Sequence, residues 1–275
     1  MARLLFGTAG IPLSSRSNST QAGVERVHEL GLGCMEVEFV QGVTLNPESA
    51  RIVQKVAASR GIRLSAHAPY WINLNSQEPR KVAASRQYIL RAALITSILG
   101  GDGVVFHPAF YMKDSPAAVY IRVKENLLRI IQELRIEGNN VRIRPEVTGK
   151  PVQFGTLEEV LQLSAEVEGV APAIDFAHLY ARTGKVNSYG EFVAVLERTA
   201  EALGSEALAD LHMHVSGIEY SPRGERRHLP LEESDFRFEE LLRALKDLDA
   251  GGLLICESPT NEADALLLQE TYEAL

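Results

Sequence analysis

Seven side chains that can bind a metal ion stand at or near the ends of apolar, strand-length segments. A single histidine or carboxylate in such a place is usually only hydrogen-bonded or solvated. If the set converged on one place, its carboxylates would repel one another and raise one another's pKa unless cations lay among them. Their pattern therefore predicts a metal centre, provided that the fold gathers the segment ends. The seven are Glu38, His67, His107, Glu146, Asp175, His214 and Glu257.

The ligand types indicate which metal is expected. Imidazole and carboxylate together suit zinc first, then manganese or iron. Cys34 and Cys256 belong to no C-x-x-C pair, so we expect buried thiols and no purely structural zinc site. Two more histidines, His178 and His228, are expected on loops of the same face, whereas His212 should lie one layer deeper than His214 because strand residues alternate with period two.

The segments that must position these side chains alternate with segments of helical periodicity. Eight short runs rich in β-branched residues have the length of strands. They are residues 3–8, 34–40, 63–69, 103–107, 141–147, 171–175, 210–216 and 252–258. Eight amphipathic segments lie between or after them, at residues 22–30, 47–59, 79–99, 116–135, 157–167, 189–202, 236–248 and 263–275.

Eight parallel strands, each followed by a helix, close most economically as a (β/α)8 TIM barrel, with a doubly wound open sheet as the alternative. Helix starts such as Asn46-Pro47, Ser115-Pro116 and Thr156, and helix ends at Gly61 and Gly100, agree with these boundaries. No linker or composition break interrupts the alternation, so we expect a single domain over residues 1–275. In such a barrel the chemistry gathers at the C-terminal ends of the strands.

Composition limits the function classes. The chain has 275 residues, 45% hydrophobic and 23% charged, which excludes disorder and collagen-like structure. Its net charge of −8 argues against binding nucleic acid by bulk charge, but it allows a local basic rim. Because no apolar run reaches about 20 residues and the N-terminal apolar stretch is too short for a secretory signal, we expect a cytoplasmic protein without membrane contact. We also expect a monomer.

Seven short motifs occur in order along the chain and together carry a family resemblance. They are Ser-Ala-His67-Ala-Pro-Tyr70, Val-Phe-His107-Pro, Pro-Glu146-Val-Thr-Gly, Ile-Asp175-Phe-Ala-His178, His214-Val-Ser-Gly, Arg-Arg-His228 and Cys-Glu257-Ser. Each is weak alone, but the series resembles the endonuclease IV family of abasic-site endonucleases from end to end of the chain. The resemblance implies a xylose isomerase-like barrel and a trinuclear zinc site.

Carried over residue by residue, the resemblance implies three zinc positions. One zinc would take His67 and His107, and Glu146 would bridge to a second zinc. That second zinc would be held by Asp175, His214 and Glu257, and a third by His178 and His228. Manganese is an alternative metal.

The sequence departs from the family pattern at one ligand. The family places an aspartate two residues before the last histidine, where this chain has Arg226, with Glu225 beside it. An arginine cannot bind a cation, so the third metal loses a ligand unless Glu225 or water replaces it, and a two-metal site is also possible. Glu38 has no family counterpart and is expected to support the site, to face substrate or to pair with Arg63. For Arg144 we expect a buried ion pair.

The resemblance implies cleavage of damaged double-stranded DNA 5′ to abasic sites during base excision repair. Clustered divalent metals suit this chemistry because they acidify water and stabilise charge on phosphoryl oxygens. Glu146 is the expected catalytic residue. The damaged nucleotide must be turned out of the stack, and Tyr70 and Trp71 provide an apolar wedge, although a loop packed on its own helix would have the same composition. Phosphates are expected to meet Arg223, Arg226 and Arg227.

A second enzyme class uses part of the same set. Glu146, Asp175, His214 and Glu257 also resemble the single-metal quartet of xylose isomerase-like sugar isomerases and epimerases, in which carboxylates move protons. Arg226 strengthens this alternative, whereas His67, His107, His178 and His228 argue against it, since such epimerases do not need them all as ligands. A metal-binding protein that has lost catalysis is a third possibility.

Overall fold

A closed parallel sheet forms the centre of the fold in the computed structural model, which describes residues 3–275. Its strands follow the order β6-β4-β3-β2-β1-β12-β9-β8. Parallel bridges from Ile143 to Val170 and from Glu146 to Ala173 join β6 to the segment around β8 and close the barrel. The predicted (β/α)8 barrel is therefore confirmed, and the open sheet was the wrong alternative. The strands are β1 (Leu4–Ala9), β2 (Cys34–Glu38), β3 (Arg63–His67), β4 (Gly103–Phe106), β6 (Arg142–Pro145), β8 (Ile174–Asp175), β9 (Leu211–Val215) and β12 (Gly252–Cys256).

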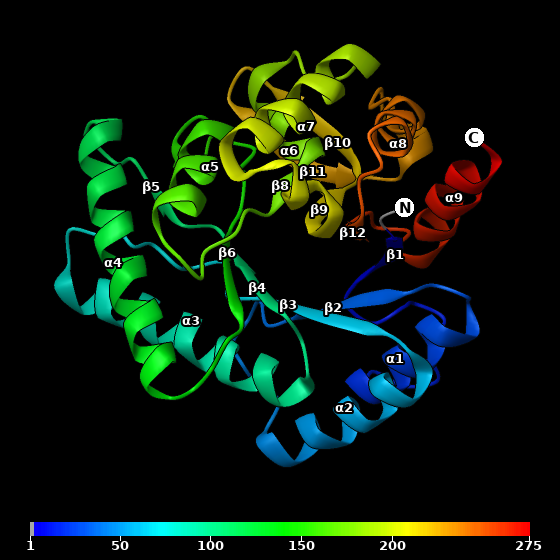
Figure 1. The fold of residues 1–275 in the computed structure, drawn as a ribbon, viewed down its shortest axis with the longest axis horizontal. Coiled ribbons are helices and arrows are strands. Elements are labelled where there is room, and N and C mark those ends of the chain that lie inside the picture. Colours follow the sequence, from blue (N-terminus) through cyan, green and yellow to red (C-terminus); the bar gives the residue numbers. More distant parts are fainter. Residues whose placement is uncertain (1–2) are drawn as a thin grey trace.

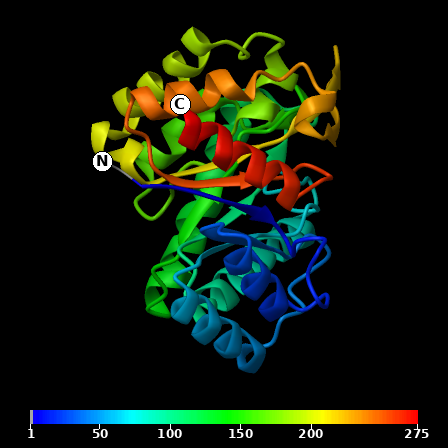
Figure 2. The ribbon, with the colours of Figure 1, turned by 90° about the vertical axis from the view of Figure 1, so that its right-hand side faces the viewer.

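Helices surround the barrel on its outside (Figure 1). The chain ends meet in the sheet, where β1 pairs with β12, and the last helix runs beside β1 in the side view (Figure 2). The helices are α1 (Thr20–Glu29), α2 (Pro47–Arg60), α3 (Pro79–Leu99), α4 (Pro116–Ile136), α5 (Leu157–Glu166), α6 (Phe176–Thr183), α7 (Tyr189–Leu203), α8 (Phe238–Asp247) and α9 (Glu262–Ala274), with 3₁₀ turns η1 (Ser205–Asp210) and η2 (Leu231–Glu233).

Local chemistry sets the helix boundaries. Asn46 accepts a hydrogen bond from the backbone of Ser49 at the start of α2, and Pro47 supplies the first turn. Thr156 and Glu159 form a reciprocal capping box at the start of α5. Gly61 ends α2 in the left-handed conformation, with φ of 67°, which a side chain would disfavour.

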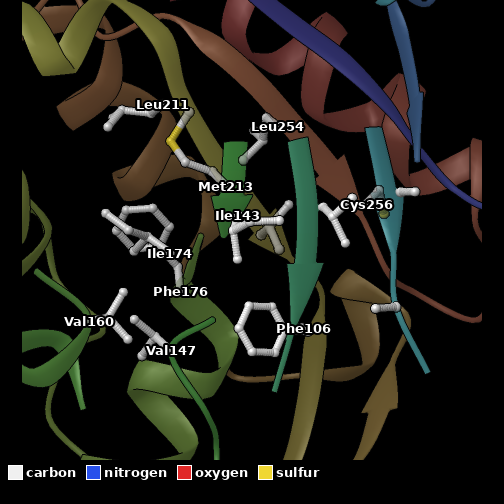
Figure 3. Packing of buried hydrophobic residues seen from close by; sticks show 14 of the residues in the cluster. Phe106, Ile143, Val147, Val160, Ile174, Phe176, Leu211, Met213, Leu254 and Cys256 are labelled. Carbon is white, nitrogen blue, oxygen red and sulfur yellow. The ribbon is translucent and has the colours of Figure 1, made fainter. Parts of the chain in front are cut away.

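The hydrophobic core lies between the strands and their covering helices. Figure 3 shows Phe106 of β4 and Met213 of β9 among the packed side chains, with Val160 of α5 and Phe176 of α6. Each of these four side chains is fully buried. Burial of a large apolar side chain stabilises the fold by about 1.5–3 kcal/mol, so this layer holds the strand ends in fixed positions.

Three parts of the chain differ from the sequence-based expectation. Residues 176–183 form α6, so His178 lies in a helix and not on a loop. The stretch before Ser234 contains an antiparallel hairpin, β10 (Gly217–Ser221) and β11 (Gly224–Leu229), which places His228 on a strand. Two short strands, β5 (Ala109–Phe110) and β7 (Gln153–Phe154), pair beside the barrel. Helix α6 is only eight residues long and follows β8 directly, and β11 is rich in charged residues, so neither gave the sequence signal of a separate element.

Residues 3–275 contain no helix that is both long and apolar enough to cross a membrane.

Candidate metal centre

The strand ends gather the predicted ligands at one rim of the barrel. His67 is the last residue of β3, and His107, Glu146 and Glu257 directly follow β4, β6 and β12. His214 lies near the end of β9. Because the strands are parallel, their C-terminal ends meet at the same face.

Glu146 lies at the centre of this arrangement and is fully buried. Its Oε2 is 2.9 Å from Nε2 of His107 and 3.1 Å from Nε2 of His67. Its Oε1 is 3.3 Å from Nδ1 of His178 and 3.3 Å from Nδ1 of His214. One carboxylate therefore faces four imidazoles on different elements.

Three groups of ligand atoms at this rim are compact enough to hold a cation, since the atoms of each group lie within 4.8 Å of one another. The groups are His67, His107 and Glu146; Glu146, Asp175, His214 and Glu257; and Asp175, His178 and His228. The first and second groups share Glu146, and the second and third share Asp175. This grouping agrees with the arrangement implied by the family resemblance, with Asp175 added to the third group.

Asp175 is fixed by the start of α6. Its Oδ1 accepts a hydrogen bond from the backbone N–H of His178 at 2.8 Å, as an N-cap residue does. Its Oδ2 is buried and has no hydrogen-bond partner among the described residues, although Nδ1 of His178 lies 3.1 Å away. A buried carboxylate oxygen without a donor costs free energy unless a cation satisfies it, so the donor set fits a metal ion.

The electrostatics of the centre are those of interleaved acids and bases. Burial opposes the charge of Glu146, but the imidazole of His107 and hydrogen bonds from three histidines hold its pKa well below the usual range. Burial opposes protonation of His67, yet Glu146 raises its pKa to about 9. Likewise, Asp175 and Glu146 overcome burial and raise the pKa of His178 to about 10. Positive charge is therefore strongly favoured among these carboxylates.

A cavity of about 370 Å³ opens onto these groups. It adds Lys150 and Gln153 to the residues named from the sequence. Sequence reasoning missed Lys150 and Gln153, although both lie in the segment between Glu146 and α5, which was a usable indication. The lining residues are His67, Tyr70, His107, Lys150, Gln153, His178, Glu225, His228 and Glu257.

The two predicted wedge aromatics, Tyr70 and Trp71, have different surroundings, and each is 51% exposed. The Tyr70 ring stacks on His107 with centroids 5.6 Å apart and meets His67 edge-on at 5.1 Å. Trp71 packs edge-on against Tyr88 of α3 at 5.9 Å. Tyr70 thus borders the cavity, whereas Trp71 leans on the neighbouring helix.

The predicted arginines lie on the β10–β11 hairpin, outside the cavity lining. Arg226 Nη1 and Arg227 Nε contact the two carboxylate oxygens of Glu219 at 2.6 and 2.5 Å. Arg223 is exposed at the turn between the strands. The structure therefore does not bring Arg226 into the place of a metal ligand.

One of the three alternatives given for Glu38, pairing with Arg63, was wrong, and so was the ion pair expected of Arg144. Arg63 begins β3 and pairs with Asp102 and Asp210, which lie at the N-terminal ends of their strands. Glu38 ends β2 and therefore lies at the other end of the barrel. Glu38 belongs to none of the ligand groups found in residues 3–275 and lines a separate cavity of about 310 Å³.

Arg144 does not form the expected ion pair but donates from Nη1 to the carbonyl of Pro172 at 3.0 Å. The nearby aspartate Asp210 is already engaged by Arg63 and Arg142.

Sequence comparison places the chain among known proteins. The profile of the xylose isomerase-like TIM barrel family matches residues 24–275. A protein of Methanocaldococcus jannaschii, "Uncharacterized protein MJ0133", is 45% identical over 273 residues, which are 99% of this chain and 98% of that protein. A probable endonuclease 4 of Symbiobacterium thermophilum is 26% identical over 225 residues, 77% of this chain and 79% of its own length.

Solved structures share the fold with two different enzyme types. The crystal structure of endonuclease IV from Thermus thermophilus covers 97% of this chain and 98% of its own, with a TM-score of 0.74 at 22% identity. A D-tagatose 3-epimerase-like protein covers 98% and 96%, with a TM-score of 0.72 at 19% identity. These structural similarities show the fold alone and favour neither of the two activities over the other. By sequence, the chain belongs to the xylose isomerase-like TIM barrel family.

Proposed function

We propose that this protein is a metal-dependent phosphodiester hydrolase that cleaves DNA 5′ to abasic sites. The observation that carries the proposal is the chain of three ligand groups joined through Glu146 and Asp175. A single-metal enzyme does not need all four of His67, His107, His178 and His228 as ligands. Weak similarity to probable endonuclease 4 proteins supports the same activity.

The residues have defined roles in this proposal. When bound, two or three zinc ions (or manganese) supply positive charge to the phosphoryl oxygens and lower the pKa of a water. Glu146 joins the first two groups, and four imidazoles face its buried carboxylate. Lys150 borders the cavity, where its ammonium group can donate hydrogen bonds to a phosphate.

Access to the cavity requires a nucleotide turned out of the DNA stack, because the ligands lie within the barrel mouth. Tyr70 borders this entrance and offers a ring face for stacking. Arg223 remains a candidate phosphate contact, as do Arg226 and Arg227. The charge of Glu219 offsets part of the attraction of the last two. A monomer, a single domain over residues 1–275 and a cytoplasmic location stay predictions.

The direct test is a nicking assay on a duplex that carries one tetrahydrofuran abasic analogue. Wild-type protein loaded with zinc should cut the damaged strand 5′ to the analogue and leave a 3′-hydroxyl, with an undamaged duplex as the control. Glu146→Gln keeps the size of the side chain but removes its charge, and it should abolish cutting. Uncut damaged duplex with fully metal-loaded wild type would refute the proposed activity.

A single-metal sugar isomerase or epimerase is the second candidate. It is favoured by the quartet Glu146, Asp175, His214 and Glu257, which is compact on its own, and by the outward position of Arg226. Metal content separates the two candidates, since one ion per chain supports the epimerase and two or three support the hydrolase. Incubation with ketohexoses, followed by separation of the C3 epimers, tests the second activity directly.

A further inference from the structure

A second cluster of ligating side chains lies one layer deeper in the barrel than the metal centre. Glu36 of β2 and His212 and His214 of β9 are almost completely buried there. Oε1 of Glu36 lies 2.9 Å from Nε2 of His214, and Oε2 lies 2.9 Å from Nε2 of His212. Ser65 Oγ donates to Oε2 of Glu36 at 2.8 Å and fixes the carboxylate.

The two nitrogens of His214 face different surroundings. Nδ1 lies 3.3 Å from oxygens of Glu146 and Glu257, both of which belong to the proposed quartet. Nε2 points into the deeper cluster, toward Glu36 and Nε2 of His212 at 3.3 Å. His214 is therefore shared between the metal centre and the deeper layer.

A histidine binds a cation through a nitrogen that carries no proton, while the other nitrogen keeps its proton. For His214 the nitrogen that faces the quartet is Nδ1, so the proton must stay on Nε2. The full negative charge nearest to Nε2 is that of Glu36, and burial increases its effect because the local dielectric constant is low.

We propose that Glu36 is a positioning residue that keeps the proton of His214 on Nε2 and thereby presents Nδ1 as a metal ligand. This inference rests on the metal centre of the proposed function. It assigns Glu36 a role that no motif indicated, since Glu36 does not line the cavity and contacts the quartet only through His214. A further metal ion within Glu36, His212 and His214 is the competing explanation. Such an ion would require His214 to lose the protons of both nitrogens.

Glu36→Gln tests the proposal because it removes the charge but keeps the size. Glu38→Gln is the control for the same change of side chain on the same strand, outside the deeper cluster; because burial raises the pKa of Glu38 to about 8, this variant removes little charge at neutral pH. Zinc affinity is measured by competition with a chromophoric chelator. We expect Glu36→Gln to weaken zinc binding about 10- to 100-fold and Glu38→Gln to leave it nearly unchanged.

The tautomer of His214 gives a second readout that does not depend on activity. In zinc-loaded wild type, ¹⁵N NMR of the imidazoles should show His214 protonated at Nε2 only, and Glu36→Gln should give a mixture of tautomers. Equal zinc affinity and an unchanged tautomer in Glu36→Gln would overturn the positioning role. Loss of one separate, additional equivalent of zinc in Glu36→Gln would also overturn the positioning role, because it would indicate an ion held by Glu36, His212 and His214 themselves. A wild-type chain that binds no zinc would refute the metal centre itself, and the positioning role with it.

Discussion

Glu225 Oε2 lies 3.5 Å from Nε2 of His178, across the cavity from the barrel wall. A register shift in the β10–β11 hairpin explains this position. Tyr220 pairs with Glu225 and Glu219 pairs with Arg227, which leaves Arg226 as an extra residue in a bulge. Strict alternation would place Arg226 and His228 on one face, but the bulge lets Glu225 and His228 face the cavity together.

Glu225 is therefore expected to replace the carboxylate that the family pattern places at position 226. Glu225→Gln should remove or weaken the ion held by His178 and His228, so that bound metal falls by up to one equivalent per chain. Elemental analysis after gel filtration measures this number. Glu219→Gln is the matched control on the same hairpin, because Glu219 contacts arginines outside the cavity. Unchanged metal content in Glu225→Gln would assign the third position to water or show that it is not used.

Gly149 creates the space that Glu225 occupies. A Cβ at Gly149 would lie 2.7 Å from Cβ of Glu225 and 2.9 Å from Cδ2 of His178. Gly149→Ala should therefore push the hairpin outward and reduce abasic-site cutting at least tenfold, with little loss of helix or sheet content by circular dichroism. Gly190→Ala in α7 is the control, because a Cβ there meets no atom within 4 Å. It should retain full activity and stabilise the helix by up to about 1 kcal/mol. Equal activity of the two variants would contradict the steric argument.

The barrel and most of the metal centre could be predicted because they depend on short-range patterns. Strand ends such as His67 and Glu257 are marked by an apolar run followed by a polar residue, and parallel strands bring such ends together by topology alone. The position of Glu225 depends on a bulge, which a single sequence does not specify. The depth of Glu36 was missed because Glu38, two residues later on the same strand, was taken as the rim residue. Which layer of the barrel a carboxylate occupies depends on the register between neighbouring strands, and that register is set by contacts distant in sequence.

Metal binding should release protons near neutral pH. The pKa of His67 is raised to about 9 and that of His178 to about 10 in the metal-free chain, so both imidazoles are doubly protonated and positively charged at pH 7.5. A metal ligand must be the neutral imidazole, hence zinc binding displaces these protons and its affinity should rise as the pH increases from 6 to 9. Titration calorimetry at pH 7.5 in buffers of different ionisation enthalpy measures the protons released. Identical binding enthalpies in phosphate and Tris would show that no net proton leaves and would contradict the charge pattern described for the centre.

The arginines of the hairpin should contribute unequally to DNA binding. Arg226 and Arg227 share the carboxylate of Glu219, whereas Arg223 is exposed at the turn and its backbone N–H donates to Ser221 Oγ. Each cation that contacts a phosphate adds about 0.9 to the slope of log affinity against log salt concentration. Arg223→Ala should lower the magnitude of this slope by about one for the abasic duplex, and Arg226→Ala should lower it by less, because Glu219 offsets its charge. Fluorescence anisotropy over a salt series measures both. A larger change for Arg226→Ala than for Arg223→Ala would show that the contact with Glu219 breaks when DNA binds, and the hairpin would then have to rearrange around the phosphate.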